Sequence, residues 1–223
     1  MSASQIADLI AGAEISAGAI RRAAVHLSKP LRSSLFSATS AEHRSASGKF
    51  FEALVYELLL AHSDTADAVR YIAAKLNDAE YHEFDRFTKD GLWYSKDGEI
   101  LFRIGKKIVA EIDFLILCSD NTLVFGEVTI NPETMPALLK EAEEKKALLK
   151  RFCEAAGLSC TPAFVLVSAS QPAEMPDLAA GDAFCCIDGG ETLWTQVHPN
   201  EILHKKRAPA PCEKRVDGRA IFR

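Results

Sequence analysis

The sequence predicts a mixed α/β fold in which helices flank one central β-sheet. Two stretches with the alternating side-chain pattern of β-strands follow each other between residues 107 and 130, and a further apolar strand is expected at 163–168. Apolar residues recur at helical spacing before and after the first two strands. The 223 residues are enough for one sizeable domain with an attached element.

The N-terminal part of the chain is Ala-rich, and its apolar residues have helical spacing over residues 3–27. Gly12 and Gly18 interrupt that pattern, which favours two short helices over one long helix. The Lys29-Pro30 pair is expected to end this helical extension, and the Ser-rich residues 33–47 are expected to form a loop or linker.

A strong amphipathic helix is predicted from about residue 45 to residue 62. Its apolar stripe consists of Phe51, Val55, Leu58 and Leu59. Glu52 falls inside this stripe, because apolar residues follow it at the third and seventh positions. Glu57 is expected to point away from the stripe and face solvent. A second helix is predicted over residues 65–77.

The middle of the chain is predicted to be β-structure. Residues 92–104 have the pattern of a hairpin that turns at Lys96-Asp97-Gly98. Two adjacent strands follow at 107–117 and 123–130, joined by the short polar turn Ser119-Asp120-Asn121. We expect these two strands to pair with each other in the sheet.

The rest of the expected core combines one helix with three strands. The helix is predicted over residues 136–156 and is stopped by Gly157. The strands are expected at 163–168, 183–187 and 192–197.

Charge is unevenly distributed along the chain, although the net charge is only −5. Both ends carry more Lys and Arg than Asp and Glu, whereas the middle is strongly acidic. This distribution fits a metal-binding core whose flanks contact phosphates, and it fits solvated termini equally well. The expected regions are an N-terminal helical segment and linker at 1–44, an α/β core at 45–200 and a basic C-terminal tail at 201–223.

Several classes of protein are not indicated. No apolar run approaches the length needed to cross a bilayer, and the N-terminus lacks the basic region of a secretory signal, so a cytoplasmic location with no membrane partner is expected. No phosphate-binding or dinucleotide-binding glycine motif occurs. The six cysteines form no C-x-x-C pair or zinc-ligand spacing, so we interpret them as reduced structural thiols.

Three acidic side chains share strand faces with Leu and Phe. They are Glu111 and Asp113 on the first strand of the central pair, and Glu127 on the second. An ionised carboxylate in apolar surroundings is costly unless a partner compensates it, and a bound cation is one such partner. The alternative is that each acid lies at a strand end, where it meets solvent or caps a turn.

These acids belong to a pattern that resembles the PD-(D/E)XK nuclease superfamily. The matching segments are Gly48-Lys-Phe-Phe-Glu52, Glu111-Ile-Asp113 and Gly126-Glu-Val-Thr129, and the resemblance covers about residues 45–190. It implies a restriction-endonuclease-like sheet and a nuclease that uses Mg²⁺ or Mn²⁺. It also implies that Asp113, Glu127 and the backbone carbonyl of Val128 bind the metal, with Glu52 acting through water or a second ion and Glu111 as a further candidate ligand.

The chain departs from the family at one position. Thr129 stands where the family usually has a lysine, and it cannot supply the positive charge that would stabilise the phosphate. Lys145 and Lys146 on the helix at 136–156 are candidate replacements, with a slight preference for Lys146, and Lys107 is a third candidate. Alternatively, both helix lysines extend from the edges of the apolar stripe to solvent.

The leading hypothesis is a Mg²⁺-dependent nuclease that cleaves DNA. Nuclease cores of this kind often form homodimers, but the sequence does not give the oligomeric state. Six basic side chains are expected to contact phosphates: Arg21, Arg22, Lys29, Arg32, Lys205 and Lys206. A second hypothesis is a nuclease-fold module that has lost catalysis and binds nucleic acid or protein, for which Thr129 is the main argument. A third is an α/β domain whose acids have no shared role.

Overall fold

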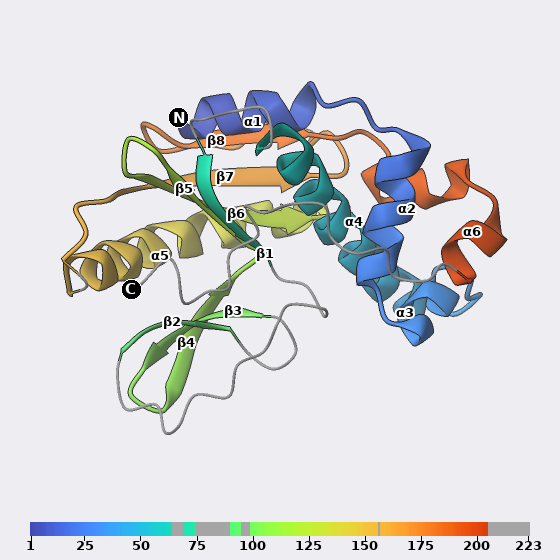
Figure 1. Ribbon diagram of the computed structural model, residues 1–223, viewed down its shortest axis with the longest axis horizontal. Helices are drawn as coiled ribbons and strands as arrows, with labels where there is room; N and C mark the ends of the chain where they lie inside the picture. Colours follow the sequence, from blue (N-terminus) through green and yellow to red (C-terminus); the bar gives the residue numbers. More distant parts are fainter. Residues whose placement is uncertain (64–68, 75–89, 95–98, 156, 205–223) are drawn as a thin grey trace.

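The computed structural model of the chain describes residues 1–63, 69–74, 90–94, 99–155 and 157–204. These residues form a five-stranded mixed sheet flanked by helices and a separate three-stranded sheet that extends away from it (Figure 1). The prediction of a mixed α/β fold with a helical N-terminal extension is confirmed at this level.

Three short helices open the chain: α1 (Ala3–Ala11), α2 (Ala17–His26) and α3 (Lys29–Ser34). Each starts after a serine whose hydroxyl accepts a backbone N–H of the first turn, which satisfies a donor that has no partner within the helix. The expectation that Lys29-Pro30 ends the helical region is wrong, because proline is favoured in the first turn and this pair begins α3.

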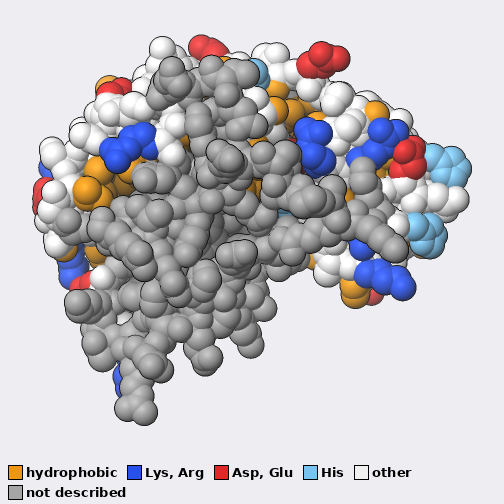
Figure 2. Space-filling model, viewed as in Figure 1, with side chains coloured by type: hydrophobic (Ala, Val, Ile, Leu, Met, Phe, Trp, Pro, Cys, Tyr) orange, Lys and Arg blue, Asp and Glu red, His pale blue; other side chains and the backbone are white. Residues whose placement is uncertain are grey.

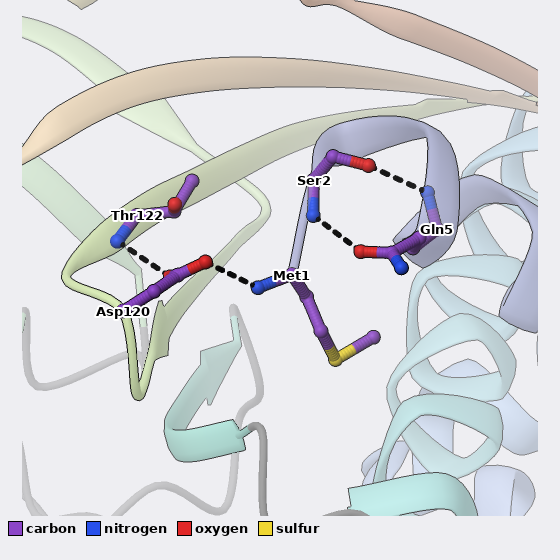
Figure 3. Close-up of polar contacts among 5 residues, drawn as sticks. All are labelled: Met1, Ser2, Gln5, Asp120 and Thr122. Carbon is purple, nitrogen blue, oxygen red and sulfur yellow. Dashed lines mark hydrogen bonds and ion pairs between the residues drawn. The ribbon is translucent and has the colours of Figure 1, made fainter.

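The start of α1 is attached to the turn between β5 (Phe114–Cys118) and β6 (Thr122–Thr129), as Figure 3 shows. The N-terminal ammonium of Met1 lies 2.8 Å from Asp120 Oδ2, and Asp120 Oδ1 accepts the N–H of Thr122 at 3.0 Å. Ser2 and Gln5 complete a capping box. This arrangement orients α1 along the sheet, where it contacts β7 (Thr161–Ser168) and β8 (Ala183–Cys186).

The long helix α4 (Ser40–Ser63) begins five residues before the predicted start, so part of the expected Ser-rich loop is helical. The helix predicted at 65–77 is wrong for residues 69–74, which form strand β1 (Val69–Ala74). Antiparallel pairing with β5 gives the backbone N–H and C=O groups of β1 hydrogen-bond partners, and Ile72 is buried. The remaining residues of that predicted helix lie outside the described part of the chain.

The five-stranded sheet has the order β1-β5-β6-β7-β8. The two pairs β1/β5 and β5/β6 are antiparallel, whereas β6/β7 and β7/β8 are parallel. The connection from β6 to β7 runs through η1 (Pro132–Thr134) and α5 (Met135–Ala155), as predicted for that helix. The strand expected at 192–197 is instead mostly the 3₁₀-helix η2 (Gly190–Gln196), followed by α6 (Pro199–Leu203).

The strand predicted at 107–117 is two strands in two sheets. Its first part is β4 (Lys107–Ile112), which pairs with β3 (Ile100–Ile104), and β3 pairs with β2 (Gly91–Tyr94). Its second part is β5, and Asp113 lies between the two. The strands of the expected hairpin pair with each other, and its expected turn at Lys96-Asp97-Gly98 lies outside the described residues. The expected pairing of the two central strands is confirmed.

Helices cover both faces of the five-stranded sheet. One face packs against α1 and α4 through the side chains of alternate residues, among them Ile116 and Val124, and α2 packs on α4. The other packs against α5 through Leu115, Leu123 and Phe125. None of the helices in the described ranges has the length and apolar composition to cross a bilayer.

The cysteines in the described part of the chain form no disulfide with one another. Burial is the main cause that raises the pKa of Cys153 and of Cys185 to about 12. The prediction of reduced structural thiols is therefore supported for these two. Cys212 lies outside the described residues.

A glycine in β6 is required by the packing of the central pair. Gly126 is opposite Phe114, whose ring covers it so closely that an added Cβ would lie 2.0 Å from Cζ of that ring. We expect Gly126→Ala to lower the free energy of unfolding by about 1–3 kcal/mol, measured by urea denaturation. Gly48→Ala in α4 is the matched control, because nothing lies within 4 Å of its added Cβ, and it should stabilise the helix slightly.

Candidate functional site

Asp113 lies where the chain passes from the three-stranded sheet into the five-stranded sheet. Its backbone N–H donates to the carbonyl of Gly126 at 3.1 Å, and its Oδ2 accepts the N–H of Val128 at 2.8 Å. The side chain is buried. Asp113 is thus fixed to β6 by both its backbone and its carboxylate, on either side of Glu127.

Glu127 lies on the face of β6 that packs against α5, in line with Leu123 and Phe125. Its Oε1 accepts a hydrogen bond from Lys145 Nζ at 2.7 Å, and both side chains are buried. Burial lowers the pKa of the Lys145 ammonium, but the carboxylates of Glu127 and Glu141 outweigh this effect, so its pKa lies above the ordinary value. Lys145 is therefore an ammonium at neutral pH.

The structure brings Asp113 and Glu127 together, and we call them the acidic pair. Asp113 directly precedes Phe114, and Phe114 pairs with Gly126, the residue before Glu127. The hydrogen bond from Asp113 to the amide that follows Glu127 ties their backbones together. Two carboxylates from neighbouring strands and one buried ammonium make up the candidate site.

Lys145, rather than the preferred Lys146, lies beside the acidic pair. Lys146 Nζ lies 2.5 Å from Asp182 Oδ2 and 2.7 Å from Glu143 Oε1. Asp182 directly precedes β8 and also accepts the N–H of Phe164 at 3.0 Å, so this second ion pair connects α5 to the start of β8 and the middle of β7. Lys107 is an exposed residue at the start of β4.

Thr129, at the position of the family's usual lysine, is part of a turn. Its hydroxyl donates to the carbonyl of Asn131 and accepts the N–H of the same residue, both at 3.0 Å, and lies 2.9 Å from the hydroxyl of Thr134. These contacts shape the connection from β6 to α5. The side chain stabilises a turn and contributes no charge to the site.

The other predicted ligands lie in different surroundings. Glu52 accepts a hydrogen bond from Lys49 at 2.8 Å on α4, the helix that covers the face of the sheet opposite α5. Glu111 is exposed on β4, where it pairs with Leu101 in the three-stranded sheet. The expectation that Glu111 shares a continuous strand face with Asp113 is wrong, because the strand ends between them.

The basic side chains expected to contact phosphates have varied surroundings. Arg21 lies 2.5 Å from Glu201, and Arg22 lies 2.6 Å from Glu57, so both are engaged in ion pairs. Lys29 is exposed and Arg32 is half-buried, whereas Lys205 and Lys206 lie outside the described residues. At the end of the molecule formed by α2, α3 and α6, Figure 2 shows Lys, Arg and His side chains with acidic ones among them.

Glu57 is the charged residue whose placement the sequence prediction missed. The expectation that it faces solvent is wrong: it is buried where α2 packs on α4, with Arg22 Nε and His26 Nε2 each 2.6 Å from its carboxylate. Burial raises the pKa of the Glu57 carboxyl, but the hydrogen bonds from His26 and Arg22 outweigh it and hold that pKa below its ordinary value. The sequence does contain a signal for the burial of Glu57. Apolar residues surround it on almost all sides of α4, which indicates a helix that is buried on every side.

The acidic pair suits a hard divalent cation. Mg²⁺ takes oxygen ligands and usually keeps several waters, so one or two carboxylates suffice for it. Within the described ranges, no three His, Cys, Asp or Glu side chains are grouped closely enough to bind a metal by themselves. Any ion held here would therefore combine the two carboxylates with backbone oxygen or water.

Comparison with known proteins yields no relative. The chain matches no protein-family model, and no curated protein or solved structure is significantly similar to it. The interpretation of the site therefore depends on its own geometry and chemistry.

Proposed function

We propose that this chain is a Mg²⁺- or Mn²⁺-dependent nuclease that hydrolyses phosphodiester bonds, with DNA as the expected substrate. The observation that carries the proposal is that the carboxylate of Asp113 binds the amide N–H of Val128, directly after Glu127, and that the carboxylate of Glu127 binds the buried ammonium of Lys145. Carboxylates that can bind a dication, next to a cation that can bind phosphate oxygen, are the groups that such a hydrolysis requires.

Each of these residues has a separate role in the proposal. Asp113 and Glu127 would hold the cation, and the backbone oxygen of Val128 is a further candidate ligand. The bound cation would activate water and neutralise charge on the phosphate. Lys145 would supply the positive charge that Thr129 cannot, because its ammonium already lies 2.7 Å from Glu127.

The order of the elements gives the proposal further support. After α4, the chain forms the hairpin pair β2 and β3, the antiparallel pair β5 and β6, the helix α5 and the strand β7, with β1 and β4 as additional strands. This is the order on which the resemblance to the PD-(D/E)XK superfamily depends, and the acidic pair lies at the corresponding strands.

A catalytically inactive module for nucleic-acid or protein binding is the second candidate. The observation in its favour is that the ammonium of Lys145 already neutralises Glu127, while the hydroxyl of Thr129 forms hydrogen bonds within a turn. A domain with these contacts could keep the fold without binding a metal.

An assay of hydrolysis tests the proposal. Purified protein should cleave DNA in the presence of Mg²⁺ or Mn²⁺, and Asp113→Asn and Glu127→Gln should each lower the rate by about a hundredfold or more, because each removes a charged ligand. The substrates are supercoiled plasmid, linear duplex, single-stranded DNA and RNA. Glu144→Gln, at an exposed position of α5, is the matched control and should cleave like the wild type.

Two outcomes would count against the nuclease. Equal rates of DNA cleavage in the wild type and in both variants would mean that Asp113 and Glu127 do not take part in the observed hydrolysis. Absence of hydrolysis on all four substrates, together with no carboxylate-dependent binding of Mn²⁺, would leave the inactive module as the better description.

A further inference from the structure

The ammonium of Lys145 contacts two carboxylates. Its Nζ is 2.7 Å from Glu127 Oε1 and 3.2 Å from Glu141 Oε2. Glu141 lies one turn earlier on α5, and its side chain is 56% exposed, whereas those of Lys145 and Glu127 are almost completely buried. The ammonium is thus at the boundary between the buried acid of the sheet and an acid at the surface.

We propose that Glu141 is a positioning residue that retains the Lys145 ammonium at the site when a divalent cation binds Glu127. This inference rests on the proposed function, since it requires that the acidic pair bind a dication. Glu141 touches neither the metal nor the substrate in this proposal. It acts only through Lys145.

A divalent cation at the acidic pair would compete with Lys145 for Glu127. A Mg²⁺ ion lies about 2 Å from a carboxylate oxygen that it binds, so an ammonium hydrogen-bonded to the same carboxylate would be a close neighbour of like charge. Binding of the ion therefore weakens the contact between Lys145 and Glu127. An ammonium has three N–H donors and remains costly to leave without an acceptor.

Glu141 provides that acceptor without a large movement. The spacing of four residues on one helix keeps its carboxylate beside Lys145, and the contact at 3.2 Å already exists. The stem of Lys145 is packed in the interior, so the ammonium can shift toward Glu141 but cannot extend freely into water. It stays near the acidic pair, where a phosphate oxygen would need it.

The first test measures the binding of Mn²⁺ alone by titration calorimetry. Glu141→Gln should weaken Mn²⁺ binding by about threefold to tenfold, because Glu141 contributes more once Glu127 has been taken by the ion. Glu143→Gln is the matched control: it lies on the same helix, pairs with Lys146 and should stay within about twofold of the wild type. In a Lys145→Met background, Glu141→Gln should have no effect, since the residue through which it acts is gone.

The second test is steady-state hydrolysis of DNA at saturating Mn²⁺. Glu141→Gln should lower kcat by about tenfold and leave KM within about twofold, as expected when a group that stabilises the transition state is displaced. The far-ultraviolet circular dichroism of each variant should match the wild type, because both substituted glutamates are exposed.

The outcomes separate the two proposals. Wild-type protein that does not bind Mn²⁺ contradicts the proposed function, and the inference fails with it. Mn²⁺ binding that Glu141→Gln leaves unchanged, or weakens equally in the Lys145→Met background, contradicts the inference alone. Loss of affinity only when Lys145 is present supports it.

Discussion

Glu57→Ala should lower the free energy of unfolding by about 3 kcal/mol at neutral pH. The carboxylate is buried between α2 and α4, and two side chains of α2 bind it at 2.6 Å. Its removal leaves Arg22 and His26 without their shared acid and opens a gap between the helices. We place the loss at the low end of the range for a broken buried pair, because Arg22 is partly exposed and His26 can become neutral.

Urea denaturation followed by circular dichroism measures this loss, and Glu144→Ala on the exposed face of α5 is the control. Glu57→Gln distinguishes the contribution of the negative charge to the free energy of unfolding from that of packing, since glutamine fills the same space without the charge. A loss below about 1 kcal/mol in Glu57→Ala would contradict a structural role for the buried carboxylate.

The contribution of the Glu57 charge should depend on pH in a defined direction. Its pKa in the folded protein lies below the ordinary value of 4.5, so the folded state favours the ionised form. The stabilisation is therefore present above the unfolded-state pKa and is lost as the pH falls through the lower folded-state pKa. The difference in unfolding free energy between the wild type and Glu57→Gln should be largest near neutral pH and should diminish in acid. A difference that grows in acid would have the wrong sign.

The same residue shows what a sequence pattern could not predict about the fold. Amphipathic spacing identified α4 and one of its buried stripes, but it assigned the opposite side to water. The N-terminal helix α2 covers that side, and its presence there depends on contacts between segments far apart in the chain. The apolar residues around Glu57 indicate a helix that is buried on every side, but only the tertiary structure identifies Arg22 and His26 as its partners.

The strand before Asp113 illustrates a second limit. Alternation of side chains continues from Lys107 to Leu117 without interruption, so the sequence predicts one strand. The structure has two strands instead, because Ile112 is the last residue that pairs with β3 and Phe114 is the first that pairs with β6. The antiparallel pairing of β5 and β6 was predictable, because apolar alternation and a polar turn are features of one short stretch of sequence. The change from one sheet to the other at Asp113 was not predictable, because it depends on pairing with strands elsewhere in the chain.

The choice between Lys145 and Lys146 depends on the rotation of one helix. Lys145 lies midway between Leu138 and Phe152 at intervals of seven, and Lys146 has the same relation to Leu139 and Cys153. Both lysines therefore continue rows of the apolar stripe, and the sequence favours neither strongly. In the structure α5 is turned so that Lys145 meets Glu127 and Lys146 meets Asp182.

Lys145→Met should be the most destabilising change at the candidate site when divalent cations are removed with EDTA. It leaves the buried carboxylate of Glu127 without its ammonium, which costs about 3–5 kcal/mol. Adding Glu127→Gln to the same chain should recover much of this loss, because a neutral amide is easier to bury than a carboxylate that has lost its ammonium. Lys140→Met, at an exposed position of α5, should change the unfolding free energy by less than about 0.5 kcal/mol.

Divalent ion should then rescue Lys145→Met more than it stabilises the wild type. In the variant a dication can bind Glu127 without displacing an ammonium, and ion at a hundred times its dissociation constant adds about 2.7 kcal/mol to the free energy of unfolding. The measurement is urea denaturation with and without Mn²⁺, repeated in the Lys145→Met/Glu127→Gln double variant, where the rescue should be lost. A loss on Lys145→Met that neither Glu127→Gln nor Mn²⁺ reduces would mean that the packing of the lysine stem, rather than its charge beside Glu127, stabilises this part of the sheet.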